Sequence, residues 1–333
     1  MVDKKKGIEE KDENSEDITE IDTNKEENND FDENEMELDP QTLENNKNFE
    51  ELINEIDSND DLESDQELNS IPELKYLGSD FLGKLDNKVS AKSLKKEEKR
   101  RQRAATERVL DENTAFILYK WLNSGDLTEL VGLVSAGKEA NVYFGYSKER
   151  KPAAIKIYKK DSHSVRWMNR YIKGDPRFNK VGKGTLQVVY TWAKKEFKNL
   201  GRLNNHNIKA PFPYKVKNNI LLMSYIGDEN GTPAPRLKDV DEFQNLNKEI
   251  STSIKLIEDM FRKAKLVHGD LSEFNILYHQ GTQYLIDVSQ AVTILHPDAL
   301  PFLARDIKNM WTFWNRMEPN PFSMEDLYYN IIK

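Results

Sequence analysis

The chain has 333 residues and a net charge of −9, a length that suits one large domain or two modest ones. It contains no cysteine, which excludes a disulfide scaffold, a thiolate metal site and a cysteine nucleophile. No apolar run approaches the roughly 18 residues that a membrane-spanning helix needs. The N-terminal residues lead into acidic sequence rather than the apolar core of a secretory signal, so we expect a soluble intracellular protein.

The net charge conceals a division along the chain. Residues 1–80 carry 29 acidic and 7 basic side chains, a net charge of −22, whereas residues 81–333 carry 42 basic and 29 acidic ones, a net charge of +13. A segment rich in Asp, Glu and Asn and poor in aromatic residues buries too little apolar surface to fold. This predicts a disordered acidic tail over residues 1–75, which screens a basic surface, binds basic partners or has no specific role.

A basic linker or helix is predicted over residues 76–105. Its stretch Ala91–Arg103 combines strong helix formers with many Lys and Arg residues. Such a stretch could contact RNA phosphates, act as a nuclear import signal or form a solvated helix face. Composition alone leaves these three interpretations open.

From residue 109 onward, apolar spacing and turn residues predict a folded domain of alternating strands and helices. The basic, glycine-containing stretch Asp161–Gly184 is predicted as a mobile loop. The other predicted elements, in chain order, are a helix capped by Asp111 and ended by Gly125, two strands within Leu133–Gly145 joined by a glycine turn, a strand at Ala153–Tyr158, a helix at Leu186–Leu203, a strand at Ile220–Tyr225, a helix at Asn247–Ala264, a hairpin of Asn275–Tyr278 with Tyr284–Val288, and helices at Ala299–Met317 and Met324–Ile332.

An acidic loop carries the strongest chemical pattern. Asp270 precedes Asn275 by five residues, and Asp287 follows an apolar strand shortly afterwards. In a phosphoryl-transfer site this spacing lets Asp270 accept the proton of an attacking hydroxyl while Asn275 and Asp287 hold Mg²⁺. Each residue alone is better explained as a loop cap, but the three together between two β-runs predict a catalytic loop.

A lysine in the middle of a strand needs a partner for its charge. Lys156 lies within the predicted strand, and Glu196 on the following predicted helix is its best partner. In this pairing Lys156 would hold nucleotide phosphates and Glu196 would hold Lys156. The alternative for Glu196 is a surface ion pair with the lysines around it.

The predicted glycine turn is a weak phosphate-binding motif. It contains Ser135, Gly137 and Lys138 but a single glycine, and it lacks the Gly-x-x-x-x-Gly-Lys-Ser/Thr pattern of a Walker loop. The hydroxyl of Ser135, the backbone of Gly137 and the amine of Lys138 could contact phosphates. Its position shortly before Lys156 favours this interpretation over a plain hairpin turn.

From about Thr106 to the C-terminus, the assembled motifs resemble the RIO family of atypical protein kinases, and most of all its Rio-one subfamily. The motifs that carry the resemblance are Ser135–Tyr143, Ala154–Tyr158, Met223–Gly227, Val267–Tyr278, Ile286–Gln290 (Ile-Asp-Val-Ser-Gln, specific to this family) and His296-Pro297. The acidic tail lies outside it.

The resemblance implies an α+β, two-lobed protein-kinase-like fold of the compact Rio type, over residues 106–333. A small β-rich N-lobe would span about 106–223 and a helical C-lobe about 227–333, with ATP and Mg²⁺ between them. The nucleotide-binding residues implied are Ser135, Gly137, Lys138, Val142, Lys156, Met223, Ser224 and Ile226, the last two through backbone groups to adenine. The catalytic residues implied are Asp270, Asp287, Lys156 and Glu196, with Asn275 and Asp287 as metal ligands.

The resemblance also implies a biological setting. The family acts in maturation of the small ribosomal subunit, and its aspartate at the position of Asp287 can accept phosphate in an ATPase cycle. The implied partners are the pre-40S particle, its rRNA and associated assembly factors, and the implied location is the cytoplasm with shuttling to the nucleus. No membrane partner is expected.

Three departures from familiar patterns matter. Gly269 and Ala136 stand where the subfamily often has alanine and threonine, and no Ala-Pro-Glu motif follows Asp287. Ordinary protein kinases place a peptide-docking activation loop there, which puts peptide substrates in doubt. A small-molecule phosphotransferase of the aminoglycoside type and a non-catalytic ATP-binding assembly factor are the alternative functions.

Overall fold

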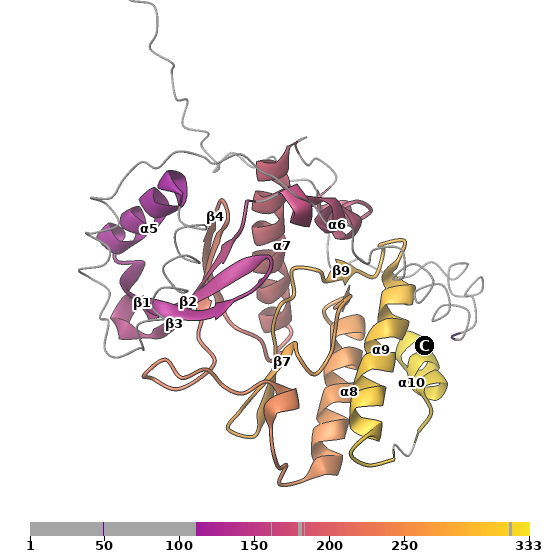
Figure 1. The fold of residues 1–333 in the computed structure, drawn as a ribbon. Coiled ribbons are helices and arrows are strands. Elements are labelled where there is room, and N and C mark those ends of the chain that lie inside the picture. Colours follow the sequence, from indigo (N-terminus) through magenta and orange to yellow (C-terminus); the bar gives the residue numbers. More distant parts are fainter. Residues whose placement is uncertain (1–48, 50–110, 161, 179–181, 183, 320–321) are drawn as a thin grey trace, which may run out of the picture.

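Helix α5 (Glu112–Ser124) opens the continuous part of the computed structural model, which describes residues 49, 111–160, 162–178, 182, 184–319 and 322–333 (Figure 1). The Asp111 side chain accepts a hydrogen bond of 2.8 Å from the N–H of Thr114 and so caps the helix. Gly125 ends it in the left-handed conformation, at a φ of 74°. Both predicted ends of this helix are confirmed.

A five-stranded antiparallel sheet follows, with the strand order β1-β2-β3-β5-β4. Its strands are β1 (Leu127–Ala136), β2 (Ala140–Ser147), β3 (Pro152–Tyr158), β4 (Pro213–Lys217) and β5 (Ile220–Ser224). Apolar residues of α5 and the sheet, among them Trp121 and Ile155, form one buried cluster. Strand β4 was not predicted; it is an edge strand that begins with proline and carries two lysines, a composition that masks a strand in the sequence.

The predicted mobile loop at 161–184 is wrong. Most of it forms helix α6 (Ser162–Ile172) and a short 3₁₀ turn, η3 (Pro176–Phe178). Met168 and Ile172 of α6 are buried, and the Trp167 ring lies 5.1 Å from that of Trp192 in the next helix. This apolar spacing is helical, but the surrounding Lys, Arg and Gly residues conceal it in the sequence.

The remaining helices are α7 (Thr185–Asn205), α8 (Leu246–Arg262), α9 (Ala299–Asn315) and α10 (Met324–Ile332). Helix α7 contacts β4 and β5 of the sheet, whereas α8, α9 and α10 pack on one another in the C-terminal half (Figure 1). A β-rich part and a helical part therefore adjoin each other, which confirms the predicted α+β, two-lobed arrangement. In the described part of the chain, no helix is long and apolar enough to cross a membrane.

Two small sheets lie among these helices. Strands β7 (Ile276–His279) and β8 (Thr282–Leu285) form the predicted hairpin. Its turn residues Gln280 and Gly281 both have positive φ, 50° and 72°, as a tight hairpin turn requires. Strands β6 (Leu266–Val267) and β9 (Val292–Thr293) also pair, and they are too short for a sequence pattern to reveal.

The predicted acidic tail and basic linker lie outside the described residues, with one exception. Phe49 is 4% exposed and belongs to the main buried cluster, and its ring centroid lies 5.4 Å from that of Tyr328 in α10. The prediction of disorder is therefore wrong at this residue. The linker at 76–105, including Ala91–Arg103, stays a prediction.

Substituting Phe49 tests this contact. Burial of a phenylalanine side chain stabilises by up to about 3 kcal/mol, so we expect Phe49→Ala to lower the thermal unfolding midpoint by roughly 3–8 °C. Phe31→Ala, the same change elsewhere in the acidic segment, is the matched control and should leave the midpoint unchanged. Equal midpoints for the two variants would show that the Phe49 contact adds nothing to stability.

Candidate active site

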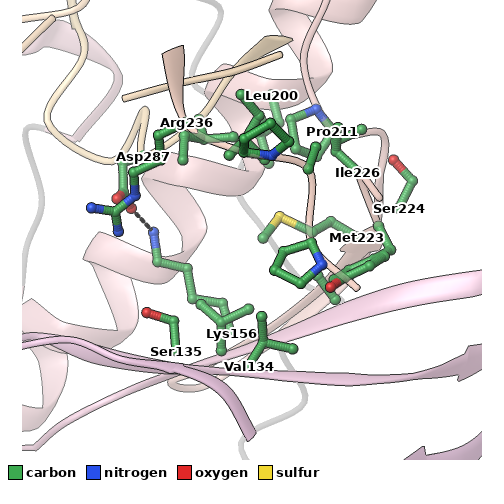
Figure 2. Close-up of a pocket in the computed structure, with 18 of the residues that line it drawn as sticks. Val134, Ser135, Lys156, Leu200, Pro211, Met223, Ser224, Ile226, Arg236 and Asp287 are labelled. Atoms are coloured by element: carbon green, nitrogen blue, oxygen red, sulfur yellow. Dashed lines mark hydrogen bonds and ion pairs between the residues drawn. The ribbon is translucent and has the colours of Figure 1, made fainter. Parts of the chain in front are cut away.

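A cavity of about 370 Å³ lies between the sheet and the helical part, walled by strands β1, β2, β3 and β5, by α7 and by the loops around 211, 226, 235 and 287. Of the twelve predicted site residues, eight line it: Ser135, Val142, Lys156, Glu196, Met223, Ser224, Ile226 and Asp287. Figure 2 shows these walls facing one another across the cavity. The cavity thus gathers residues from just over 150 positions of sequence into one site.

Lys156 contacts two acidic side chains of this site. Its Nζ donates hydrogen bonds to Glu196 Oε1 at 2.9 Å and Oε2 at 2.8 Å, and it also contacts Asp287 Oδ1 (Figure 2). Lys156 is 6% exposed and Glu196 is 1% exposed, so the pair is shielded from water. The predicted contact between the two residues is confirmed, and the surface ion pair considered for Glu196 is wrong.

Burial and charge act in opposite directions on these groups. Burial alone lowers the pKa of Lys156, but the charges of Asp287 and Glu196 outweigh it, so the pKa lies above its ordinary range. Burial raises the pKa of Glu196 despite the adjacent ammonium group. For Asp287 the positive charge of Lys156 prevails and lowers the pKa. Asp287 is therefore ionised at neutral pH, ready to bind a cation.

Asp287 has an unusual backbone conformation. Its φ is 59°, in the left-handed region that costs a residue other than glycine roughly 1–2 kcal/mol. The neighbouring backbone is held in place because the N–H of Ile286 bonds to the Asn275 carbonyl at 3.0 Å and Val288 is fully buried. The Asp287 side chain is 52% exposed, toward the cavity. Strain of this kind is characteristic of functional positions.

Asp270 and Asn275 lie beside the cavity rather than in its wall. Asn275 Nδ2 donates to the Asp270 carbonyl at 2.7 Å and approaches Asp270 Oδ2 at 3.4 Å. Gln290 Nε2 donates to the same Oδ2 at 3.2 Å. Burial raises the pKa of Asp270, which suits a carboxylate that accepts a proton near neutral pH.

The turn between β1 and β2 places Gly137 and Lys138 outside the cavity wall. The Gly137 N–H bonds to the Ala140 carbonyl at 2.9 Å, and a Cβ at Gly137 would stand only 3.0 Å from that oxygen. Lys159 Nζ donates to the Gly137 carbonyl at 2.6 Å. Glycine is thus explained by the tight turn, while the contacts of Gly137 and Lys138 with phosphates stay predictions.

Glu139, in the same turn, had no role in the sequence analysis. Burial and the charges of Asp287, Asp270 and Glu196 raise its pKa to about 7, and Lys156 opposes this shift. The folded-state pKa thus exceeds the unfolded one, so this group favours the folded state at low pH and loses that contribution as pH rises toward 7. Above pH 7 it adds a negative charge to a site already rich in carboxylates.

This charge predicts a pH-dependent affinity for nucleotide. Between pH 6 and 8, we expect the affinity for ADP in the presence of EDTA to fall by about fivefold more in the wild type than in Glu139→Gln, because only the wild type gains the charge. Fluorescence titration with an ADP analogue measures this, and the nucleotide's own protonation cancels in the ratio of the two proteins. Parallel pH profiles would contradict the assignment.

The end of β5 and the segment after it hold Ser224 and Ile226, whose backbone contacts with adenine stay predictions. The Ser224 N–H is bonded to the Phe212 carbonyl at 2.8 Å, and the Ile226 carbonyl accepts from the N–H of Ala234 at 3.1 Å. Within the described residues the N–H of Ile226 has no acceptor. The N–H of Ile226 is therefore free to bind a base, whereas the N–H of Ser224 is not.

Helix α9 contributes residues that the sequence analysis missed. Asp306, which is 1% exposed, accepts hydrogen bonds from the N–H groups of Gly269 at 2.9 Å and Leu271 at 2.7 Å. Asn309 Nδ2 donates to the Leu271 carbonyl at 3.0 Å. These bonds hold the backbone on both sides of Asp270. No local motif indicates a role for Asp306 or Asn309, because the residues that they contact are more than 30 positions away in the sequence.

The residues present fit a magnesium ion. Because Asn275 donates through Nδ2, its Oδ1 is left as an acceptor, and Asp287 offers a half-exposed, ionised carboxylate. Among the described residues, no group of three or more His, Cys, Asp or Glu side chains forms a metal cage. Mg²⁺ is commonly held by one or two protein oxygens together with phosphates and water, so this donor set suits it.

Comparison with known proteins gives consistent matches. The family model of the RIO domain matches residues 141–327. Serine/threonine-protein kinase rio1 of Dictyostelium discoideum is 37% identical over 298 residues, which cover 86% of this chain and 50% of that protein. Human serine/threonine-protein kinase RIO1 is 41% identical over 251 residues, covering 73% and 44%. The chain spans about half the length of these two relatives.

An archaeal relative and a solved structure extend the comparison. RIO-type serine/threonine-protein kinase Rio1 of Haloferax volcanii is 36% identical over 211 residues, which cover 62% of this chain and 71% of that protein. The crystal structure of the Rio2 kinase-ADP/Mg²⁺-phosphoaspartate complex from Chaetomium thermophilum matches with a TM-score of 0.51 and 21% identity, covering 66% of each chain. At that identity the likeness concerns the fold.

Proposed function

This chain belongs to the RIO domain family, and on that premise we propose that it is an ATP- and Mg²⁺-dependent atypical serine/threonine kinase with ATPase activity. The observation that carries the proposal is the contact of Lys156 with both Glu196 and Asp287 in the wall of the cavity. A buried lysine between two carboxylates is the arrangement that orients nucleotide phosphates in kinases. Curated relatives named as serine/threonine-protein kinases support this assignment.

The chain's own residues supply binding, orientation and proton transfer. The N–H of Ile226 would bind the base, and Lys156, held by Glu196, would contact the phosphates. Asn275 Oδ1 and the Asp287 carboxylate would hold Mg²⁺, which when bound neutralises charge on the phosphates. Asp270, whose pKa is raised by burial, would take the proton of the attacking hydroxyl or water.

We further propose that Asp287 itself accepts phosphate. In this step an Asp287 carboxylate oxygen attacks the γ-phosphorus, the bond from that phosphorus to the bridging oxygen breaks, and ADP leaves. Water then hydrolyses the acyl phosphate, which releases inorganic phosphate and restores the carboxylate. The Chaetomium thermophilum Rio2 kinase, crystallised as an ADP/Mg²⁺-phosphoaspartate complex, supports this chemistry, as does the exposure of the Asp287 side chain to the cavity.

Incubation of the purified full chain with radiolabelled ATP and Mg²⁺ tests both proposals. We expect ATP turnover together with labelled protein, part of which loses its label on treatment with hydroxylamine because acyl phosphates are cleaved by it. If all of the label resisted hydroxylamine, it would be phosphoserine or phosphothreonine alone, and this result would count against the aspartyl phosphate. No turnover and no labelling would contradict the kinase and ATPase assignment itself.

The proposed partner is the pre-40S particle with its rRNA and assembly factors, in the cytoplasm and with shuttling to the nucleus. The net charge of +13 over residues 81–333 supports an RNA partner. Binding of small-subunit pre-rRNA should then weaken steeply as salt rises from 50 to 200 mM, by about 10³-fold if some six phosphates are contacted. An affinity that stays constant over this salt range would contradict the proposal of an RNA partner.

A further inference from the structure

The turn that follows Asp287 is enclosed by polar side chains of helix α7. Lys195 Nζ donates to the carbonyls of Ser289 at 3.1 Å and Gln290 at 3.3 Å, and it also contacts the Ala291 carbonyl. Lys195 is completely buried. An ammonium group has three donors and no acceptor, so three carbonyl oxygens match its hydrogen-bonding capacity.

Asn199, one helical turn further along α7, binds the same segment. Its Nδ2 donates to the carbonyls of Val288 at 2.7 Å and Ala291 at 2.9 Å. The amide is oriented by Arg177, whose Nη1 donates to Asn199 Oδ1 at 2.8 Å. Lys195 and Asn199 together therefore bind every carbonyl from residue 288 to residue 291.

A buried acid completes this network. Asp175 accepts from Arg177 Nε at 3.0 Å and Nη2 at 2.8 Å, and its Oδ2 lies 4.0 Å from Lys195 Nζ. Burial lowers the pKa of Lys195, and the Asp175 carboxylate opposes this shift. Buried charges persist only when they are paired and hydrogen-bonded, and here the three carbonyls of one turn accept from the three donors of the lysine.

The same turn links the two acidic residues of the site. Asp287 immediately precedes it and contacts Lys156, while Gln290 within it donates to Asp270 Oδ2 at 3.2 Å. Glu196, the neighbour of Lys195 on α7, binds Lys156. Helix α7 thus contacts Lys156 through Glu196. Through Lys195 and Asn199 it contacts the 288–291 turn, which adjoins both Asp287 and Asp270.

We propose that Lys195 and Asn199 are positioning residues that fix the 288–291 turn and, through it, set Asp287 and Asp270 relative to Lys156. The inference rests on the proposed function for its catalytic consequence. Because the strained φ of Asp287 persists only where the surrounding structure enforces it, loss of the carbonyl contacts frees this residue to leave the left-handed region. Helix α7 and the Asp287 segment are then one unit, and α7 does not move away from the site by itself.

Lys195→Met tests the proposal, since methionine fills a similar volume but donates no hydrogen bond. Hydrogen exchange of the nucleotide-free full chain, followed by mass spectrometry, should show exchange in peptides covering residues 286–292 that is about tenfold faster or more. We expect kcat for ATP turnover to fall by about 10- to 100-fold with a smaller change in KM for ATP. Lys198→Met, the same change at a partly exposed α7 lysine, is the matched control for both measurements.

Gln290→Leu provides a second variant in case Lys195→Met does not fold. It removes the donor to the Asp270 carboxylate and leaves the lysine contacts in place. We expect kcat for ATP turnover to fall by about tenfold while exchange in 286–292 stays unchanged, because Lys195 and Asn199 still bind the turn. This separates the link to Asp270 from the stability of the turn.

The outcomes separate the inference from the proposed function. Exchange and kcat of Lys195→Met within twofold of those of Lys198→Met would overturn the positioning role. A kcat of Gln290→Leu equal to that of the wild type would overturn the link from the turn to Asp270. If the wild-type chain shows no ATP turnover, the proposed function fails, and the exchange comparison still decides whether Lys195 holds the turn.

Discussion

Replacing Asp287 by asparagine is expected to lower the rate of ATP turnover by about 10³-fold or more. The change removes the ionised carboxylate that faces the cavity and contacts Lys156, and loss of one preorganised charge at a reacting centre typically costs 10²–10³ in rate. If Asp287 also accepts phosphate, the hydroxylamine-sensitive label should disappear entirely. Steady-state phosphate release and hydroxylamine treatment measure the two effects.

The substitution leaves the backbone intact. Asparagine adopts the left-handed region more readily than most residues, so a φ of 59° is compatible with it. The attraction between Asp287 and Lys156 is lost, but Lys156 keeps its pair with Glu196. We therefore expect the thermal unfolding midpoint to fall by no more than a few degrees, which separates a catalytic defect from misfolding. Asp241→Asn, at an exposed aspartate outside the cavity, should retain full turnover. Unchanged turnover in Asp287→Asn would make the proposed mechanism wrong.

Local sequence patterns predicted the elements whose signals lie within a few residues of each other. The α5 helix is an example, because Asp111 and Gly125 supply both end signals and its apolar residues recur at helical spacing. Helix α6 shows the limit of the approach. Its apolar residues become recognisable only in the tertiary structure, where Met168 and Ile172 are buried and the Trp167 ring packs on that of Trp192 in α7. Composition alone suggested a loop there.

The residues of the candidate site also fall into those that a local motif predicts and those that only the tertiary structure reveals. Lys156, Asp270, Asn275 and Asp287 stand in local motifs, and their spacing predicted them. Asp306 and Lys195 have no motif, because their partners are backbone groups of segments 35 to 96 positions away. Sequence reasoning finds the side chains that would meet the nucleotide, whereas the side chains that hold those groups in place emerge from the tertiary structure.

Replacing Lys156 by methionine is expected to abolish measurable ATP turnover and to weaken nucleotide binding, because the cation that would face the phosphates is lost. The change also leaves Glu196 buried without its partner. An uncompensated buried charge costs about 3–5 kcal/mol unless it becomes neutral. Lys255→Met, which breaks an exposed pair with Asp259, should cost less than about 1 kcal/mol and serves as the matched control.

The sign of the pH dependence distinguishes this explanation from a general packing defect. Without Lys156, the folded-state pKa of Glu196 rises further above its unfolded value, so folding favours the protonated form. The free energy of unfolding of Lys156→Met should then fall as pH increases through the range between those two values, and fall more than in the wild type.

The double variant Lys156→Met/Glu196→Gln separates the two roles of the lysine. Glutamine has no charge to compensate, so the double variant should regain most of the stability lost at pH 8 while ATP turnover stays absent. Urea unfolding at pH 6 and pH 8, combined with phosphate release, measures both quantities. If Glu196→Gln restored no stability at pH 8, the buried carboxylate would not be the source of the loss, and Lys156 would act mainly through packing.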